Sequence, residues 1–289
     1  MVEHSFGGPW TERKLKCLRD YLNAYRTIFT GNPKARYFRT WYVDAFAGTG
    51  SRTTKSETPL LDIYGDTEVQ EYHAGSAKIA LGLASPFDNY LFIEKSKPRV
   101  GQLQSVIQSE FLALFNRCHF LAGDANVQLR KWCGERDWSK ERAVVFLDPY
   151  GMQVNWSTVE TLAATKGVDL WYLFPGIGRL LRHDGNIDEK WKVRLDTLLG
   201  TDEWRTRFFQ SYLRTDLFGE MEGIERTAPE AAIEGFIHER LATCFGKNVG
   251  KGLILRNSKN SPLYFLSFAA SNERGARAAL NIANSILDD

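Results

Sequence analysis

The chain has 289 residues, of which 43% are hydrophobic, 25% charged and 13% aromatic, a composition that excludes disordered, collagen-like and low-complexity proteins. No apolar run approaches the roughly 18 residues of a membrane span, and the opening MVEHSFGGPW lacks the order of a signal peptide, so we expect a cytoplasmic protein with no membrane partner. Its 37 basic and 35 acidic residues give a net charge of +2, which excludes attraction of nucleic acid by the surface as a whole.

The first predicted element is an amphipathic helix from about Thr11 to Phe29, because apolar residues recur there at helical spacing. Residues 11–39 hold eight basic and two acidic residues, so we expect a basic helical extension over residues 1–39. These charges form either a solvated helix face or a face that contacts phosphate groups. The basic residues are Arg13, Lys14, Lys16, Arg19, Arg26, Lys34, Arg36 and Arg39.

Short apolar runs that end at or near glycine, aspartate or glutamate follow this helix. They cover residues 40–46, 89–94, 118–124, 143–148 and 168–175. Continuous apolar runs of this length are typical of strands buried on both faces. Helical segments are predicted between them, near residues 75–84, 97–115, 125–134 and 155–165. The alternation predicts a doubly wound α/β fold with a mostly parallel sheet.

The last third of the chain has a different pattern. Helices are predicted over 187–199, 201–213 and 229–245, followed by an antiparallel hairpin from the runs 252–257 and 262–268, and a final helix over 273–287. Five parallel strands followed by a hairpin is the element order of class I methyltransferases. We therefore expect one Rossmann-like domain over residues 1–289 with a seven-stranded sheet, an inserted loop at 51–72 and a helical insertion or cap at 176–228.

The first strand runs into the segment Asp44-Ala-Phe-Ala-Gly48-Thr-Gly50. Glycines in such a turn let the backbone approach a nucleotide-like ligand closely. Thr53 stands where a dinucleotide-binding fingerprint needs a third glycine, which disfavours an NAD-dependent oxidoreductase. S-adenosylmethionine has no pyrophosphate, and its cationic amino group suits a carboxylate such as Asp44. An ordinary strand-to-helix turn is the alternative.

Carboxylates also end the second and third strands. Glu94, in Phe92-Ile-Glu-Lys, is placed to accept hydrogen bonds from ribose hydroxyls. Asp124, in Gly123-Asp-Ala, can accept a hydrogen bond from an adenine amine, although it is also a good helix N-cap candidate. Three acidic strand ends in this order favour an adenosyl ligand.

The fourth strand ends in FLDPYG, residues 146–151. An exocyclic base amine is a poor nucleophile because its lone pair is delocalised into the ring. The Asp148 carboxylate and the Pro149 carbonyl are expected to accept the amine protons, and Tyr150 to stack on a base taken out of its helix. A tight structural turn is the alternative interpretation.

Together these four segments resemble motifs I to IV of class I S-adenosylmethionine-dependent methyltransferases. The resemblance implies S-adenosylmethionine as the cofactor and a catalytic role for Asp148, Pro149 and Tyr150. The residues expected to bind the cofactor are Asp44, Phe46, Gly48, Gly50, Glu94, Lys95, Asp124 and Ala125. The cysteines and histidines are scattered without ligand spacing, and no metal site is expected.

More narrowly, the chain resembles the three-Cys-motif partner protein family in KLKCLRDYLNAY (14–25), FLDPYGMQVNW (146–156) and LWYLFPGIGRLL (170–181). That family is methyltransferase-like and is named for a genomically associated partner that bears three cysteines, so the resemblance implies such a partner. Adenine and cytosine amino-methyltransferases usually have two prolines after the Asp or Asn. The sequence Asp148-Pro149-Tyr150-Gly151 is closer to the DPFG-type segment of enzymes that methylate guanine in transfer RNA, so the target base stays open.

We therefore expect a methyltransferase that acts on an exocyclic amino group of a nucleic-acid base. The alternative is a binding module that keeps the methyltransferase fold, works with a three-cysteine-motif protein and methylates nothing.

Overall fold

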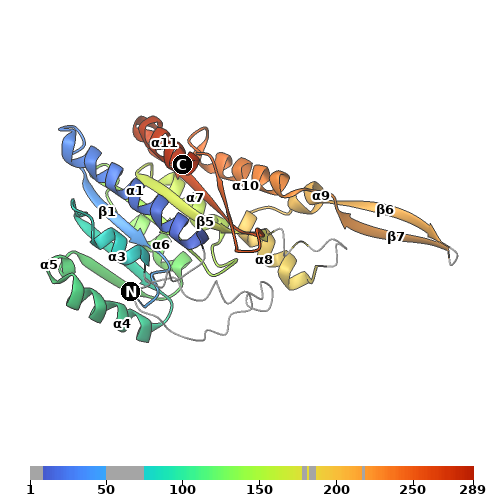
Figure 1. The fold of residues 1–289 in the computed structure, drawn as a ribbon, viewed down its shortest axis with the longest axis horizontal. Coiled ribbons are helices and arrows are strands. Elements are labelled where there is room, and N and C mark those ends of the chain that lie inside the picture. The colour runs from blue at the N-terminus through green and yellow to red at the C-terminus, as the bar shows by residue number, and fades with distance from the viewer. Residues whose placement is uncertain (1–8, 50–74, 178–180, 182–186, 217–218) are drawn as a thin grey trace.

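The computed structural model describes residues 9–49, 75–177, 181, 187–216 and 219–289. Its centre is a seven-stranded sheet with the order β3-β2-β1-β4-β5-β9-β8 (Figure 1). The first five strands are parallel, and β9 lies antiparallel between β5 and β8. The strands are β1 (Arg39–Asp44), β2 (Asn89–Glu94), β3 (Cys118–Ala122), β4 (Glu141–Leu147), β5 (Val168–Pro175), β8 (Leu253–Arg256) and β9 (Pro262–Ala270). The predicted α/β class and mostly parallel sheet are confirmed.

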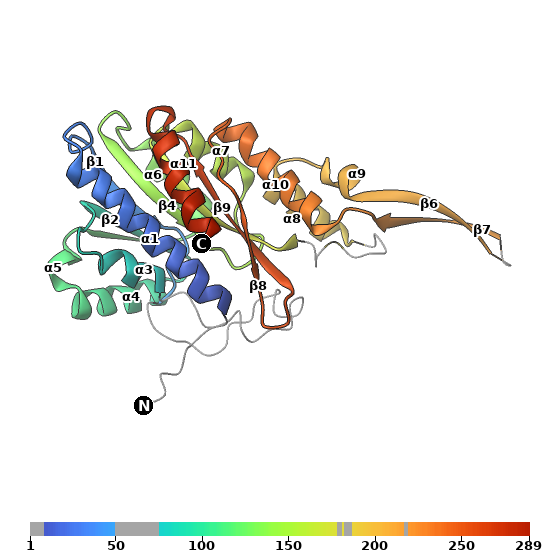
Figure 2. The same cartoon turned by 45° about the horizontal axis from the view of Figure 1, so that its top comes forward.

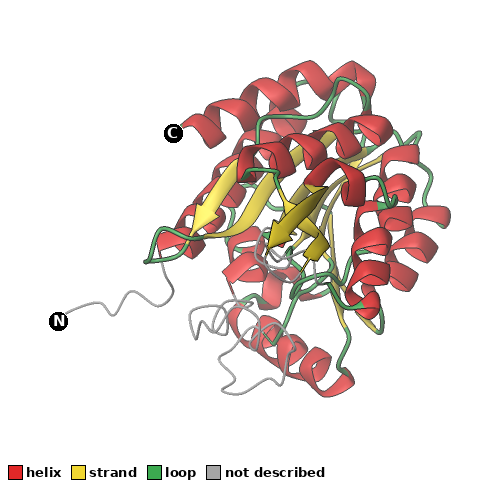
Figure 3. Ribbon diagram, turned by 90° about the vertical axis from the view of Figure 1, so that its right-hand side faces the viewer, coloured by secondary structure: helices red, strands yellow, loops and turns green. Residues whose placement is uncertain are grey.

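Helices cover both faces of the sheet (Figure 3). One face is covered by α1 (Pro9–Gly31), α3 (Gly75–Leu81), α4 (Lys97–Glu110) and α11 (Glu273–Asp288). The other is covered by α6 (Ala125–Gly134), α7 (Trp156–Ala164), α8 (Glu189–Leu199), α9 (Trp204–Phe208) and α10 (Glu230–Phe245). The helix predicted over 97–115 is divided at Phe111 into α4 and the short α5 (Leu112–Phe115).

Alternate residues of the central strands supply the two cores. In β1, Trp41 and Val43 pack on the α6–α7 side, whereas Tyr42 packs on the α1–α11 side. In β4, Val145 packs on the α6–α7 side and Val144 on the α1–α11 side. Because side chains alternate along a strand, the even-numbered positions of these two strands face α1. Figure 2 shows α1 and α11 side by side over that face, and their residues are in contact.

The helix predicted over 201–213 is wrong beyond Phe208. Residues from Phe209 onward form β6 (Phe209–Asp216), which pairs antiparallel with β7 (Gly219–Arg226) in a separate two-stranded sheet. Trp204 and Phe208 have the spacing of buried residues on a helix, and this periodicity ends at Phe208. The strand β6 forms because it pairs with β7, which follows it in the chain. The ribbon of β6 and β7 projects away from the main body (Figures 1 and 2).

The basic helix is part of the main body rather than an added surface. Lys14 and Arg26 of α1 are 2% and 7% exposed, so these two charges lie in the interior and do not belong to a solvated helix face. The predicted insertion at 51–72 lies outside the described residues. None of the described helices combines the length and the hydrophobicity that a membrane-spanning helix needs.

Candidate active site

The predicted acidic residues lie along one edge of the sheet. Because β2, β1 and β4 are neighbouring parallel strands, their carboxyl ends bring Glu94, Asp44 and Asp148 to adjacent positions. Asp124 follows β3, the next strand outward. Ligands of open α/β sheets bind at this edge, beside the point where the strand order reverses. In this chain that point lies between β1 and β4.

Asp44 is fully buried at the end of β1. Its carboxylate accepts hydrogen bonds from the Ser76 hydroxyl at 2.6 Å, the Phe46 amide at 3.2 Å and the Tyr42 hydroxyl at 3.4 Å. Burial raises the pKa of the Asp44 carboxyl from 3.8 to about 7, with a further increase from the Asp148 charge, although the Ser76 bond acts in the opposite direction. The position therefore favours a cation that approaches the ionised carboxylate.

The turn after Asp44 lies between the neighbouring strand ends. The Ala45 amide donates to the Phe146 carbonyl and the Ala47 amide to the Ile93 carbonyl, at 3.2 and 2.9 Å. Phe46 is half-buried against the core on the α6–α7 side. Gly48 is buried with φ of 62°, and Gly50 lies outside the described residues. The turn is thus tied to both β4 and β2.

Replacement of Gly48 by alanine is expected to lower the free energy of unfolding by about 1–2 kcal/mol, because a side chain at positive φ meets the following carbonyl. Urea denaturation measures the change. Gly101→Ala in α4 is the control, since that helical glycine has open space around it, and it is expected to stabilise by about 0.5–1 kcal/mol. Equal effects of the two substitutions would contradict the assigned turn conformation.

Glu94 and Asp124 occupy the next two strand ends and differ in their surroundings. Glu94 is 8% exposed, and its Oε1 accepts a hydrogen bond from the Ser96 amide at 2.9 Å, while the adjacent Lys95 is exposed. Asp124 is exposed and caps α6 by accepting from the amides of Asn126 and Val127 at 3.0 and 3.2 Å. Its predicted N-cap role is confirmed. The next residue, Ala125, is buried.

Asp148 forms a buried ion pair that was not predicted from the sequence. Lys14 Nζ of α1 lies 2.6 Å from Asp148 Oδ2, with side-chain exposures of 2% and 7%. Within the described residues, Asp148 Oδ1 accepts no hydrogen bond. The electrostatic effects of both Asp148 and Lys14 reach Asp44, so these three charges form one group at the centre of the edge.

Pro149 and Tyr150 complete the segment after β4. Pro149 is buried, and Tyr150 is half-buried beside the core on the α1–α11 side. Burial raises the pKa of the Tyr150 hydroxyl, with a further increase from the nearby Asp148 charge and a smaller one from Glu94. The Tyr150 amide donates to Gln153 Oε1 at 3.2 Å. Tyr150 therefore lies within electrostatic range of both neighbouring carboxylates.

The sheet order and the antiparallel β9 together define a seven-stranded, mostly parallel Rossmann-like α/β fold, as predicted. No family model and no curated protein matches the chain.

Solved structures resemble the chain at low identity. Protein LPL1258 from Legionella pneumophila is 13% identical over 93% of this chain and 99% of that one, with a TM-score of 0.43. An O-methyltransferase from Bacillus cereus, solved with SAH, is 13% identical over 87% of this chain and 80% of that one, with a TM-score of 0.41. An rRNA methylase from Streptococcus thermophilus is 11% identical over 87% of this chain and 93% of that one, with a TM-score of 0.34. At these values the likeness carries no information on substrate or activity.

Sequence reasoning missed Lys14 and Ser76 as members of this edge. Lys14 lies three, four and seven positions before the buried Cys17, Leu18 and Tyr21, so it belongs to the apolar stripe of its helix. A lone lysine on such a stripe is a signal for a buried counter-charge. Ser76 carries no comparable signal, because its bond to Asp44 joins residues 32 positions apart. Among the described residues, no group of three His, Cys, Asp or Glu side chains is arranged to hold a metal.

Proposed function

We propose that this protein is an S-adenosylmethionine-dependent methyltransferase that acts on an exocyclic amino group of a nucleic-acid base. One observation carries the proposal: Asp44, Glu94 and Asp148 lie at three adjacent strand ends of a class I methyltransferase fold. A carboxylate on each strand offers one acceptor for a cationic amino group, one for ribose hydroxyls and one for an amine that loses a proton.

The residues present fit S-adenosylmethionine. Asp44 is buried and held by the Ser76 hydroxyl, so its negative charge is costly until a cation approaches it. The amino group of the methionine moiety supplies that cation. Glu94 keeps its Oε1 on the Ser96 amide and is fixed in place for a ribose. The positive φ of Gly48 turns the backbone between these two carboxylates.

The sulfonium of the bound cofactor supplies an electrophilic methyl group. The protein has to orient the acceptor amine and accept its protons. Lys14 holds Asp148 through Oδ2, which leaves Oδ1 to accept a hydrogen bond from an amine N–H. The Pro149 carbonyl is the proposed second acceptor, and Tyr150, which lies within electrostatic range of Asp148 and Glu94, is the residue proposed to stack on the base. These contacts would favour a pyramidal nitrogen with a localised, more nucleophilic lone pair.

The cofactor half of the proposal is tested by calorimetry with S-adenosylmethionine. Asp44→Ala and Glu94→Ala are each expected to weaken binding about tenfold or more, since a charge-assisted hydrogen bond contributes about 1.5–3 kcal/mol. Asp20→Ala and Glu110→Ala remove exposed carboxylates of the same kinds and are expected to bind as the wild type does. Absence of binding by the wild type at millimolar ligand would refute the proposal.

A second candidate function is a partner-binding module that performs no methyl transfer. The buried Lys14–Asp148 pair supports it, because the carboxylate expected to receive the amine already has a partner. We also propose that the chain is related to the three-Cys-motif partner family. In that case the partner would be a three-cysteine-motif protein.

Mass spectrometry of nucleic acids separates the two functions. Cells that express the wild type are expected to contain a methylated base that is absent with Asp148→Ala, while the exposed-residue variant Asp20→Ala retains it. If the wild type leaves no methylated base although it binds the cofactor, the partner-binding module is the correct function.

A further inference from the structure

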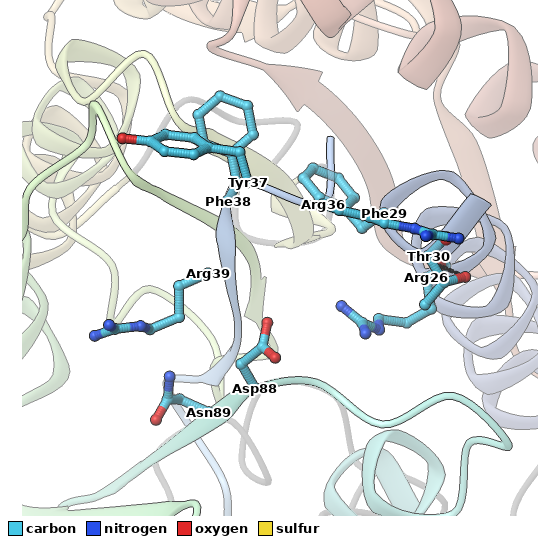
Figure 4. A pocket seen from close by; sticks show the side chains of 9 residues that line it. All are labelled: Arg26, Phe29, Thr30, Arg36, Tyr37, Phe38, Arg39, Asp88 and Asn89. Atoms are coloured by element: carbon cyan, nitrogen blue, oxygen red, sulfur yellow. Dashed lines mark hydrogen bonds between the residues drawn. The ribbon is translucent and has the colours of Figure 1, made fainter. Parts of the chain in front are cut away.

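A cavity lies at the opposite edge of the sheet from the acidic strand ends. It has a volume of about 570 Å³ and opens where β1 and β2 begin, beside the end of α1 (Figure 4). Its lining contains three arginines and one carboxylate, that of Asp88. The arginines are Arg26 from α1, Arg36 from the connection to β1, and Arg39 from the first position of β1.

Two of these arginines are held by neutral oxygen atoms. Arg26 donates to the Thr40 hydroxyl at 2.5 Å and to the Ser85 carbonyl at 3.3 Å. Arg36 donates through Nε to the Thr30 carbonyl at 2.5 Å. Within the described residues, neither guanidinium has a carboxylate at ion-pairing distance. The terminal nitrogens of the exposed Arg36 therefore keep their donors for a ligand, in an orientation that Thr30 fixes.

The remaining charges leave the cavity basic. The Asp88 carboxylate accepts hydrogen bonds from the Thr40 hydroxyl and amide at 2.6 and 2.8 Å, so it is engaged with protein donors. The Arg39 side chain is 66% exposed, and its Nη1 lies 3.8 Å from Oε1 of the buried Glu141, at the limit of an ion pair. A contact this long engages the guanidinium only weakly, so the other Arg39 donors stay open to a ligand. Guanidinium groups in such a setting match the geometry of phosphate oxygens.

An exposed aromatic ring stands beside these donors. Tyr37 is 66% exposed, and its ring meets the neighbouring Phe38 edge to face, with centroids 5.5 Å apart. Phe38 is itself anchored, because the Arg142 guanidinium lies 3.8 Å from its ring centroid. Tyr37 thus has a supported ring with an open surface. Aromatic rings next to cationic groups are the stacking platforms on which proteins bind single-stranded nucleic acids.

We propose that this cavity binds a nucleotide unit of a single-stranded nucleic acid, with Arg36 and Arg39 on its phosphates and Tyr37 stacked on a base. Free phosphate would contact only the arginines, and a free nucleotide would contact the arginines and the Tyr37 ring. A strand also uses the exposed Lys34 on the same connection. This site is separate from the acidic edge and needs neither the cofactor nor methyl transfer.

The two edges are joined by α1. Its first turns hold Lys14 at the acidic edge, its last turns hold Arg26 at the cavity, and Lys16 and Arg19 are exposed between them. The six residues of β1 separate the edges by about 20 Å. That the same nucleic-acid strand also presents the acceptor base at the acidic edge rests on the proposed function.

The test is fluorescence anisotropy with a labelled oligouridylate of about 12 nucleotides, a length in the range of single-strand binding sites, without cofactor. Arg36→Ala/Arg39→Ala is expected to weaken binding at least tenfold and to reduce the salt-dependence slope by about 1.4, since each lost phosphate contact on a single strand removes ~0.7. Tyr37→Ala is expected to weaken binding about 5- to 150-fold at an unchanged slope. Circular dichroism verifies that each variant is folded.

The matched control is Lys190→Ala/Arg207→Ala, which removes two exposed cations from α8 and α9, on the face of the sheet away from α1, and is expected to bind as the wild type does. Equal losses in the two double variants would overturn the proposal, as would no binding by the wild type. Displacement by AMP as effective as by unlabelled oligouridylate would assign the site to a free nucleotide, and displacement by polyglutamate to an acidic protein. Calorimetry measures the affinity of the same variants for S-adenosylmethionine. It therefore tests the proposed function separately from nucleic-acid binding at this cavity.

Discussion

Replacement of Lys14 by methionine is expected to lower the free energy of unfolding by about 3–5 kcal/mol, because it leaves the buried Asp148 carboxylate without its counter-charge. Methionine preserves most of the volume of the lysine stem, so the loss reports on the charge rather than on a cavity. Urea denaturation at neutral pH gives the change from the shift of the midpoint at constant slope.

Two further variants identify the cause. Lys16→Met removes an exposed lysine that pairs with Asp20 on the same helix, and is expected to cost no more than about 1 kcal/mol. The double variant Lys14→Met/Asp148→Leu replaces both buried charges by apolar groups and is expected to recover most of the lost stability. Equal losses for Lys14→Met and Lys16→Met would show that the buried pair does not form.

The affinity for S-adenosylmethionine is expected to fall about tenfold for each pH unit below about 7, reaching about 100-fold at pH 5. Burial and the Asp148 charge raise the pKa of the Asp44 carboxyl from 3.8 to about 7, so below that pH the carboxyl carries a proton that the cationic ligand must displace. The ligand amino group stays charged over this range. Calorimetry between about pH 5 and 8 measures the profile.

Asp44→Asn is the control, because an amide does not titrate here. Its affinity is expected to be low and independent of pH between 5 and 7, whereas Glu94→Gln keeps the slope at reduced affinity. The stability of the ligand-free protein changes in the opposite sense. With a raised pKa the folded state binds more protons than the unfolded state between about pH 4 and 7, so this contribution to stability falls as pH rises. A pH profile unaltered by Asp44→Asn would assign the titration to another group.

The arrangement of the sheet could be predicted from the sequence because its signals are local. Runs such as NYLFIE and AVVFLD are apolar throughout, and a strand buried on both faces needs this pattern. A carboxylate that directly follows such a run must lie at the carboxyl edge of a parallel sheet, so the shared edge of Asp44, Glu94 and Asp148 followed from their positions. The N-cap role of Asp124 is local for the same reason.

The missed contacts concern partners that are distant in sequence, whereas the one wrong element, β6, pairs with the next strand along the chain. No local feature of residues 209–213 indicates pairing with β7, so the helix predicted from residue 201 was extended to residue 213. The helix around Lys14 was predicted, yet the partner of that lysine lies 134 positions away, and Asp44 depends on Ser76 in the same manner.

The sequence by itself therefore determined the α/β sheet and the edge at which its acidic residues meet, because hydrophobic periodicity and strand direction are properties of short segments. The tertiary structure decided what each charge faces. It placed Lys14 and Arg26 in the interior and left Lys16, Arg19, Arg36 and Arg39 on the surface. The sequence gives the number of charges in the basic segment, but it does not give their surroundings. Burial removes water from a charge, so a buried charge needs one specific partner. Only the packing of segments that are distant in sequence supplies that partner.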